Sequence, residues 1–405
     1  MDEEKQSKRL IFITLGKGPG VSHGLLFSIK KQNPDTIVLM TTKESNKTYE
    51  ELTNNLRDKK IDIIKEDCDE INDIEVIYKN FSNIIQTYLN KGYSKENIVV
   101  DYTSGTKVMS AALVAVAIAK GLGNFSYVFG QRDISGRVQS GTERLSSLTV
   151  NRIITENYLN LFITFFNKNQ FDLALNILNQ ITEVHPDFDE KIKLYKSLAL
   201  AFSYWEKFNF KKSFDLLDNI DQSELAKNGL KKKVEAAKQY LYKLKLENNS
   251  KDRMQEMIFN ALRRADEGKY DDAIARLYRA IEMLGQIEFE KSFNCLTSDV
   301  QLFSIPENLR DDINNKYYDN KDGKIKLPLF ATFDFLKKID NEVGVRFYDK
   351  FNLIKKILHL RNNSILAHGN NPLGADEFNE AFELIEFLID LHKKNNDRIY
   401  FLELQ

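Results

Sequence analysis

The chain has little of what marks a secreted, membrane-bound or metal-stapled protein. Its two cysteines, Cys68 and Cys295, lie far apart and have no metal-ligand spacing, so we expect free thiols in a reducing cytosol. The first residues are charged and no apolar signal segment follows them. The longest apolar run, 108–123, is interrupted by Ser110 and Lys120 and is too short to span a membrane. We therefore expect a cytoplasmic protein with no membrane segment.

Charge and glycine pattern exclude further classes. The formal net charge is −1, so no global field attracts nucleic acid and any such site must be a local patch. The glycine-rich loop 16–20 has neither the Gly-x-x-x-x-Gly-Lys-Ser/Thr pattern of a P-loop nor the Gly-x-Gly-x-x-Gly dinucleotide fingerprint. NTP hydrolysis and NAD chemistry therefore lack their usual sequence.

The first 150 residues alternate between strand and helix patterns, which is typical of a parallel sheet with helices on both faces. We expect strands at 10–15, 36–40, 62–65 and 98–101, and a closing hairpin that pairs 125–129 with 137–139. We expect helices through Leu25 and Ile29, over 76–89 and over 108–122. Ligands on such sheets bind at the C-terminal ends of the strands.

The rest of the chain has a helical pattern, which gives a fold class of α/β plus all-α. Three similar motifs, beginning at Phe171, Phe210 and Tyr270, are spaced by 39 and 60 residues, which favours helical hairpins that resemble tetratricopeptide units without a regular repeat. A polar break at 247–252 indicates a boundary, so we expect domains at 1–150, 151–250 and 251–405. The last domain should contain helices at 254–268, 270–289, 329–339, 349–367 and 375–394, and a polar loop at 314–326. The lysine-rich segment 227–245 is either a solvated face or an RNA-facing surface.

The first candidate site follows the strand at 98–101. Small hydroxyl residues, a glycine and a lysine come between this strand and a helix, an arrangement that holds phosphate at a helix N-terminus. An ordinary strand–helix turn capped by Thr or Ser is the alternative. The glycine loop would form a second wall, or else is only a flexible turn. The candidate ligand residues are Thr14, Gly16, Lys17, Gly18, Thr103, Ser104, Gly105, Thr106 and Lys107.

The second candidate site is Arg361, Asn362 and His368. If one helix runs over 349–367, Arg361 and His368 share a face about 10 Å apart along its axis, and Gly369 ends the helix. A histidine moves protons near neutral pH and an arginine holds a scissile phosphate. No metal is required if the 2′-hydroxyl of RNA is the nucleophile. The alternative is a helix-end histidine and a surface arginine; a composite site in a homodimer would supply two copies of each group.

Together these residues resemble a known family. Asp101 to Lys107 at a strand end resembles a CARF domain, the CRISPR-associated Rossmann fold. Arg361, Asn362 and His368 in a C-terminal helical domain resemble a HEPN ribonuclease. Their order resembles the CARF–HEPN ancillary ribonucleases of type III CRISPR systems, with a Rossmann-like CARF sheet, a helical linker domain and a HEPN domain.

The resemblance implies a mechanism of antiviral defence. Two CARF domains of a homodimer bind a cyclic oligoadenylate as allosteric activator, and the HEPN dimer then cleaves single-stranded RNA without a metal cofactor. It assigns catalysis to Arg361, Asn362 and His368, and ligand binding to the two loops. We favour a ring of four adenylates over six. Cleavage of the activator by Thr103 and Lys107 stays open. The alternative function is a non-catalytic CARF regulator, but the acidic segment 376–390 offers no basic recognition helix.

Overall fold

The structure, a computed structural model, describes residues 8–18, 20–70, 72–132, 134, 138–246, 251–367, 369–389 and 401–404. It divides into two compact units, one of Met1–Thr164 with Leu173–Lys193 and one of Phe165–Asp172 with Leu194–Gln405. Among the described helices, none has both the length and the apolar character that a membrane crossing needs.

The first unit contains a six-stranded, mostly parallel sheet, as the sequence predicts. Its strands are β1 (Leu10–Thr14), β2 (Thr36–Thr41), β3 (Asp62–Asp67), β4 (Ile98–Asp101), β5 (Asn124–Phe129) and β6 (Arg144–Thr149). Their order is β3-β2-β1-β4-β5-β6, and only β6 runs antiparallel. Every residue of β1, β2 and β4 is buried, which explains their continuous apolar sequence.

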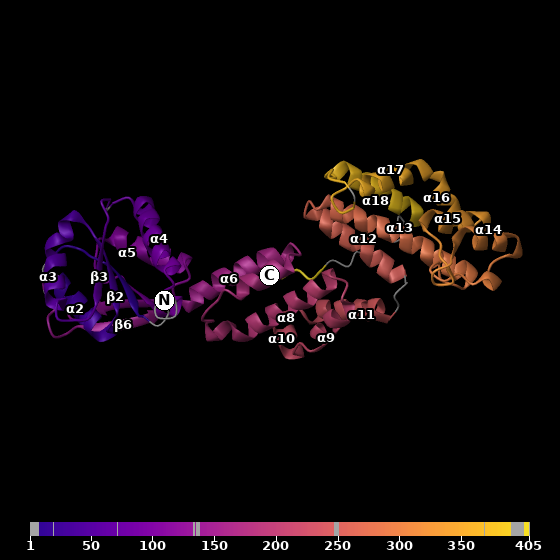
Figure 1. The fold of residues 1–405 in the computed structure, drawn as a ribbon. Coiled ribbons are helices and arrows are strands. Elements are labelled where there is room, and N and C mark those ends of the chain that lie inside the picture. Colours follow the sequence, from indigo (N-terminus) through magenta and orange to yellow (C-terminus); the bar gives the residue numbers. More distant parts are fainter. Residues whose placement is uncertain are drawn as a thin grey trace. The chain divides into compact units, whose positions relative to one another are not determined.

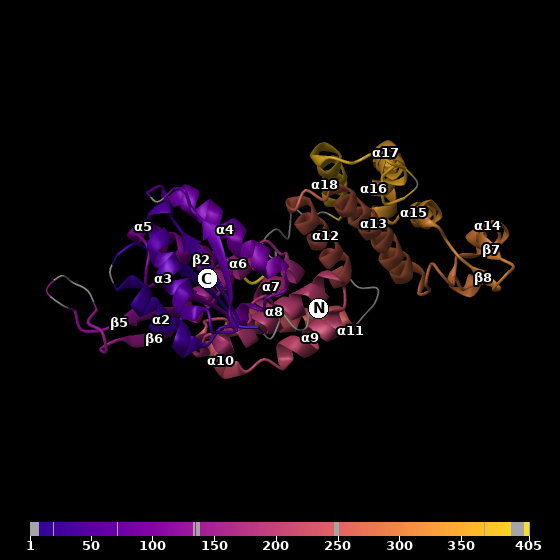
Figure 2. The same ribbon diagram turned by 60° about the vertical axis from the view of Figure 1, so that its left-hand side comes forward.

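Helices cover both faces of this sheet (Figures 1 and 2). The helices α4 (Ile74–Asn90) and α5 (Lys107–Ala119) pack on one face, and α2 (Val21–Gln32) and α3 (Asn46–Leu56) pack on the other. The helix α3 was not predicted, because its buried positions Thr48, Leu52 and Leu56 recur every four residues within a polar segment.

The predicted partner of β5 was wrong. Arg137 lies outside the described residues, and Val138 forms only an isolated bridge with Arg132. The strand that pairs with β5 is β6, which is rich in serine and mostly exposed, so its hydrophobic pattern is weak. An edge strand needs no continuous apolar sequence because one of its sides faces no neighbouring strand.

The helical region that follows comprises α6 (Asn151–Asn167), α7 (Phe171–Leu178), α8 (Asp189–Glu206), α9 (Phe210–Asp218), α10 (Gln222–Lys227) and α11 (Lys231–Leu246). The three predicted motifs share one turn geometry. Each aromatic residue begins a helix, and the residue two positions before it has a positive φ: 60° at Asn169, 59° at Phe208 and 74° at Gly268. The same backbone turn therefore starts three helical hairpins, as expected.

The last part of the chain is also helical. It comprises α12 (Lys251–Asp266), α13 (Tyr270–Phe293), α14 (Glu307–Tyr317), α15 (Leu329–Lys338), α16 (Glu342–Asp349), α17 (Phe351–Asn362) and α18 (Ala375–Ile389). The predicted polar loop at 314–326 was wrong, because α14 continues to Tyr317 and the short strands β7 (Tyr318–Asp319) and β8 (Lys324–Ile325) follow. Gly323 takes a positive φ of 70° in the turn between them.

Gly285 allows α13 to approach α15 closely. A Cβ at this position would lie 2.8 Å from the Phe333 Cε2 atom, and the Phe333 ring is fully buried and stacked on Phe347 with centroids 3.9 Å apart. We predict that Gly285→Ala lowers the free energy of unfolding, because overpacking costs about 1–3 kcal/mol and outweighs the ~1 kcal/mol gain in helix propensity.

Gly24→Ala in α2 is the matched control. No atom lies within 4 Å of its Cβ position, so the same change should stabilise its unit by about 0.4–1 kcal/mol. Scanning calorimetry of both variants measures the two effects. A rise in transition temperature for Gly285→Ala would contradict the packing argument.

Candidate functional site

The two predicted ligand loops meet where the strand order reverses. β1 and β4 are parallel neighbours, with Ile13 opposite Asp101, and their connections lead to opposite sides of the sheet. Such a switch point leaves a crevice beyond the carboxyl ends of the two strands, where ligands bind in open α/β sheets. The loop after β1 carries the glycines, and the loop after β4 carries residues 103–106.

The loops are joined by direct hydrogen bonds. The Thr14 hydroxyl donates to the carbonyl of Ser104, and the Gly16 amide donates to Ser104 Oγ over 2.9 Å. Gly105 has a φ of 97°, and a Cβ there would lie 2.9 Å from the Cβ of Thr14. Glycine is therefore required at position 105 for both backbone conformation and space.

Asp101 supports these loops from the end of β4. Its buried carboxylate accepts hydrogen bonds from Ser28 Oγ, from Ser126 Oγ at 3.0 Å and from the Thr103 amide at 2.9 Å. Gln32 donates to both of these serine hydroxyls, at 2.8 and 3.0 Å, so their own hydrogens are left for the carboxylate. The sequence analysis included Asp101 in the motif but gave it no role; its signal was an acidic residue at the end of an apolar strand.

Most of the candidate hydroxyls are engaged within the protein. Thr14 and Ser104 are buried, Thr103 Oγ1 accepts the Val128 amide at 2.9 Å, and Thr106 Oγ1 accepts the Met109 amide at 3.2 Å as the N-cap of α5. These side chains shape the crevice.

The two candidate lysines are exposed. Lys17 forms a surface ion pair with Glu44, and Lys107 is the first residue of α5. Surface ion pairs contribute little, so an anion can displace Glu44 at small cost. Both ammonium groups and the backbone amides of the loops are therefore the groups available to an anion.

The second candidate site differs from the expectation. The helix α17 spans Phe351–Asn362, so the predicted helix over 349–367 was wrong in its C-terminal end. His368 itself lies outside the described residues. Ser364 accounts for the early end, because its hydroxyl and amide both donate to the Arg361 carbonyl, at 2.8 and 3.2 Å. Serine and asparagine side chains compete in this way with the helical backbone.

A tight turn replaces the last predicted turns of the helix. The amides of Ala367 and Gly369 donate to the Ser364 carbonyl, at 3.1 and 3.2 Å. Gly369 lies directly on Asn363, since a Cβ at Gly369 would come within 2.0 Å of the Asn363 carbonyl oxygen. The prediction that Gly369 ends the helix was therefore wrong. Gly369 closes this turn instead.

Arg361 rests on α13. Its guanidinium lies 5.2 Å from the centroid of the Tyr278 ring and donates to Asn362 Oδ1 over 3.0 Å. Burial, followed by the nearby Glu282 carboxylate, raises the pKa of Tyr278 to about 12, so the phenol stays protonated near neutral pH. Glu282 also pairs with Arg279 at 3.0 Å. Tyr278 was not predicted as a site residue; it lies one turn before Glu282 on the same helix face.

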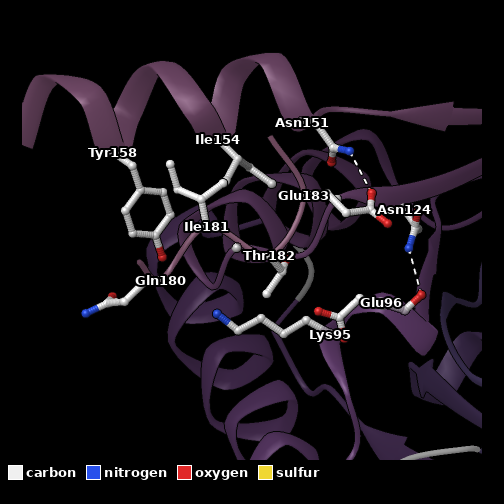
Figure 3. Close-up of a pocket in the computed structure, with 12 residues that line it drawn as sticks. Lys95, Glu96, Asn124, Asn151, Ile154, Tyr158, Gln180, Ile181, Thr182 and Glu183 are labelled. Atoms are coloured by element: carbon white, nitrogen blue, oxygen red, sulfur yellow. Dashed lines mark hydrogen bonds between the residues drawn. The ribbon is translucent and has the colours of Figure 1, made fainter. Parts of the chain in front are cut away.

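A pocket lies at the opposite end of the sheet in the first unit (Figure 3). It is lined by Lys95, Glu96, Gly121, Gly123, Asn124, Asn151, Ile154, Tyr158, Gln180, Ile181, Thr182 and Glu183. Asn151 donates to Glu183 Oε2 over 2.7 Å and Asn124 donates to the Glu96 carbonyl over 2.9 Å. The first bond links α6 to the segment after α7, and the second links β5 to the segment before β4.

Within the residues that the structure describes, no group of three or more histidine, cysteine or acidic side chains is arranged to hold a metal ion.

Two family models match the helical part of the chain. The model of the Csm6 6H domain matches residues 155–244, and the model of the Csm6 HEPN domain matches residues 245–392. Together they cover more than half of the chain. The chain belongs to the Csm6 family. The HEPN match includes Arg361, Asn362 and His368, and a Csm6 HEPN domain implies ribonuclease activity, as the sequence predicts.

No curated protein matches the chain. Among solved structures it is similar to a type III CRISPR defence DNA nuclease activated by cyclic oligoadenylate, at 12% identity and a TM-score of 0.27, over 48% of this chain and 34% of that one. It is also similar to Can2 from Sulfobacillus thermosulfidooxidans, solved with cyclic tetra-adenylate, at 12% identity and a TM-score of 0.25, over 50% of this chain and 66% of that one. The chain thus spans a third and just under two thirds of these relatives.

We predict that Asp101→Asn destabilises the sheet unit of this Csm6-family chain by about 1–3 kcal/mol, because the new amide donor must face groups that already donate. Chemical denaturation followed by circular dichroism measures the effect. Asp69→Asn is the matched control, since this carboxylate is 84% exposed and lies 3.6 Å from Lys43 Nζ. Equal stabilities of the two variants would refute the role given to Asp101.

Proposed function

We propose that this chain is a ribonuclease of type III CRISPR defence that cleaves single-stranded RNA in its HEPN domain when the sheet unit, acting as a CARF domain, binds a cyclic oligoadenylate. The observation that carries the proposal is the HEPN match over 245–392, which contains the Arg361-to-His368 segment. The position of Arg361 at a helix end, on the Tyr278 ring, supports it. The domain bounds we propose are 1–150, 151–250 and 251–405.

The proposed reaction uses the RNA's own 2′-hydroxyl. Its oxygen attacks the adjacent phosphorus, the bond from phosphorus to the 5′-oxygen breaks, and the products carry a 2′,3′-cyclic phosphate and a 5′-hydroxyl. The proton leaves the 2′-oxygen and a proton reaches the 5′-oxygen. His368 is the acid–base candidate, and Arg361 with Asn362 holds the phosphate as its charge develops. No metal takes part, and DNA is no substrate because it lacks the attacking group.

We further propose that two copies of the chain form the working site. One copy of the candidate set offers one acid–base group, His368, and one phosphate-binding group, Arg361, whereas the reaction removes one proton and delivers another. A two-fold axis supplies both groups twice. The same symmetry suits a cyclic activator shared between two sheet units.

The activator site we propose is the crevice at the end of β1 and β4. The exposed Lys17 and Lys107 ammonium groups and the backbone amides of the two loops would contact the phosphates, while the engaged hydroxyls of Thr14, Thr103, Ser104 and Thr106 maintain the loop shape. A ring of four adenylates is our first choice. Whether Thr103 and Lys107 also cleave the ring is decided by the second experiment below.

The ribonuclease proposal predicts cleavage of labelled single-stranded RNA in the presence of EDTA and a cyclic oligoadenylate. Arg361→Ala and His368→Ala should each lower kcat at least a hundredfold, since both act on the transition state. Tyr278→Leu should lower kcat about threefold to thirtyfold by removing the ring under Arg361, whereas Tyr278→Phe should keep most of the activity.

The controls are Arg346→Ala, which removes a surface ion pair with Glu342 on α16, and His185→Ala, which lies outside the HEPN match. Both should cleave like the parent. Absence of cleavage with rings of four and six adenylates would refute the ribonuclease and leave the non-catalytic regulator. Cleavage that requires a divalent ion would refute the metal-free mechanism.

The sensor proposal predicts that Lys107→Ala weakens binding of cyclic tetra-adenylate tenfold or more, because a charge-assisted hydrogen bond contributes about 1.5–3 kcal/mol. Gly105→Ala should abolish binding by separating the loops. Lys30→Ala, at the far end of α2, is the control. Calorimetric titration measures affinity, and chromatography of the ring after incubation with His368→Ala protein shows whether the sheet unit cleaves it.

If Lys107→Ala binds cyclic tetra-adenylate with unchanged affinity, the proposed sensor site is refuted. The ribonuclease proposal is independent of this result.

A further inference from the structure

Residues 401–404 pack against helices α6, α7, α8 and α11 of the 6H domain, and we call the surface that they contact the groove. The Phe401 ring meets Phe171, Phe202 and Trp205 edge-on, with centroid distances of 5.4, 5.2 and 5.0 Å. Three of the four side chains, Phe401, Leu402 and Leu404, are buried, and Glu403 is exposed. The segment itself forms no helix or strand, so side chains of the groove supply its contacts.

The groove also binds the backbone of this segment. The Asn167 side chain accepts the Leu404 amide at 2.9 Å and donates to the Leu404 carbonyl at 2.9 Å. Lys233 Nζ donates to the Glu403 carbonyl over 3.3 Å. An amide side chain that pairs with both polar groups of one residue is a way to hold an extended peptide independent of its sequence, while the apolar pockets select its side chains.

Beneath the segment lies a buried ion cluster. Arg263 of α12 is 4.1 Å from the Phe401 centroid and bonds to Glu206 of α8 at 2.5 Å and to Glu256 at 2.6 Å. The Trp205 indole donates to Glu256 over 2.9 Å. Phe401 therefore covers the charges that connect α8 of the 6H domain to α12 of the HEPN domain, and shields them from water.

We infer that this groove is a peptide-binding site of the 6H domain, that residues 401–404 of the same chain are its ligand, and that the bound segment holds α12 of the HEPN domain against α8. The groove selects an aromatic residue at the first position and leucines at the second and fourth. The covalent link keeps the local concentration of the peptide high, so modest intrinsic affinity is sufficient for full occupancy.

The chain's single tryptophan provides the readout, because Trp205 contacts Phe401 directly. In the full chain carrying Phe401→Ala and Leu404→Ala, we expect a red shift of tryptophan emission as water reaches the indole. A synthetic peptide of residues 398–405, which contains no tryptophan, should restore the parent spectrum when added in excess. The same peptide with alanine for Phe401 should bind at least tenfold more weakly.

Asn167→Ala, introduced into the same double variant, should weaken peptide binding about tenfold while it leaves the apolar groove intact. Asn157→Ala, an exposed asparagine on the same helix, is its matched control and should change nothing. Should the double variant fail to fold, Asn167→Ala in the otherwise unchanged chain still tests the groove, through faster hydrogen exchange at the Leu404 amide.

Amide hydrogen exchange along α12 tests whether the bound segment holds α12 against α8. It should be at least tenfold faster in the double variant and return to the parent rate with peptide. Unchanged emission in the double variant, or peptide affinity indifferent to Asn167→Ala, would overturn the groove. If differently labelled copies swap their 401–404 segments, the ligand comes from a second chain, which would overturn the assignment to the same chain. Unchanged α12 exchange would overturn the coupling. None of these readouts depends on the proposed ribonuclease activity.

Discussion

The connection between the two helical domains is built on a buried ion cluster centred on the guanidinium of Arg263, in which Arg264 also bonds to Glu206. Arg263 bonds to Glu206 of the 6H domain and to Glu256 on its own helix, and these side chains are at most 10% exposed. Removing one partner of a buried ion pair lowers stability by about 3–5 kcal/mol, so the loss of either carboxylate should be strongly destabilising. An apolar replacement of the whole cluster would be as stable but would fix no register. The cluster therefore specifies how α8 meets α12, and the packing of α13 on α12 builds on that register.

In the sheet unit, the equivalent constraint is the close approach of two loops at the switch point. Thr14 and Ser104 each form hydrogen bonds with the other's loop. The loops approach so closely that a side chain at Gly105 would collide with Thr14. The crevice is thus preformed by backbone contacts, and the groups left for a ligand are amides and exposed ammonium groups. Such a surface favours a phosphate-rich ligand, because amides and ammonium groups donate and do not accept. It also explains why small residues, and not a nucleotide fingerprint, mark the site in the sequence.

The sequence predicted the parallel sheet and the helical hairpins because both rest on local patterns. β1, β2 and β4 are continuous apolar runs, and the three hairpins each begin with an aromatic residue after a tight turn. The elements it missed lack such patterns: β6 is an exposed, serine-rich edge, and α3 has few apolar residues. The end of α17 was missed for a different reason. Its residues permit a longer helix. The helix ends at Asn362 because the hydrogen bonds from Ser364 to the Arg361 carbonyl compete with those of a further helical turn. Neither Tyr278 under Arg361 nor Asp101 under the loops could be found from spacing, because each acts through residues distant in sequence.

The early end of α17 separates Arg361 from the segment that follows Asn362. On one continuous helix, Arg361 and His368 would keep a fixed separation, and any movement of one would carry the other. Here Arg361 belongs to a helix and rests on Tyr278 of α13, whereas the chain after Asn362 turns, and Gly369 lies directly against Asn363. A chain of contacts transmits a signal only where one element has two arrangements. Helices α13 and α17 are long and packed, but the turn depends on a few backbone hydrogen bonds to Ser364 and Asn363. A rearrangement of that turn would therefore alter the chain beyond Asn362 without unwinding a helix.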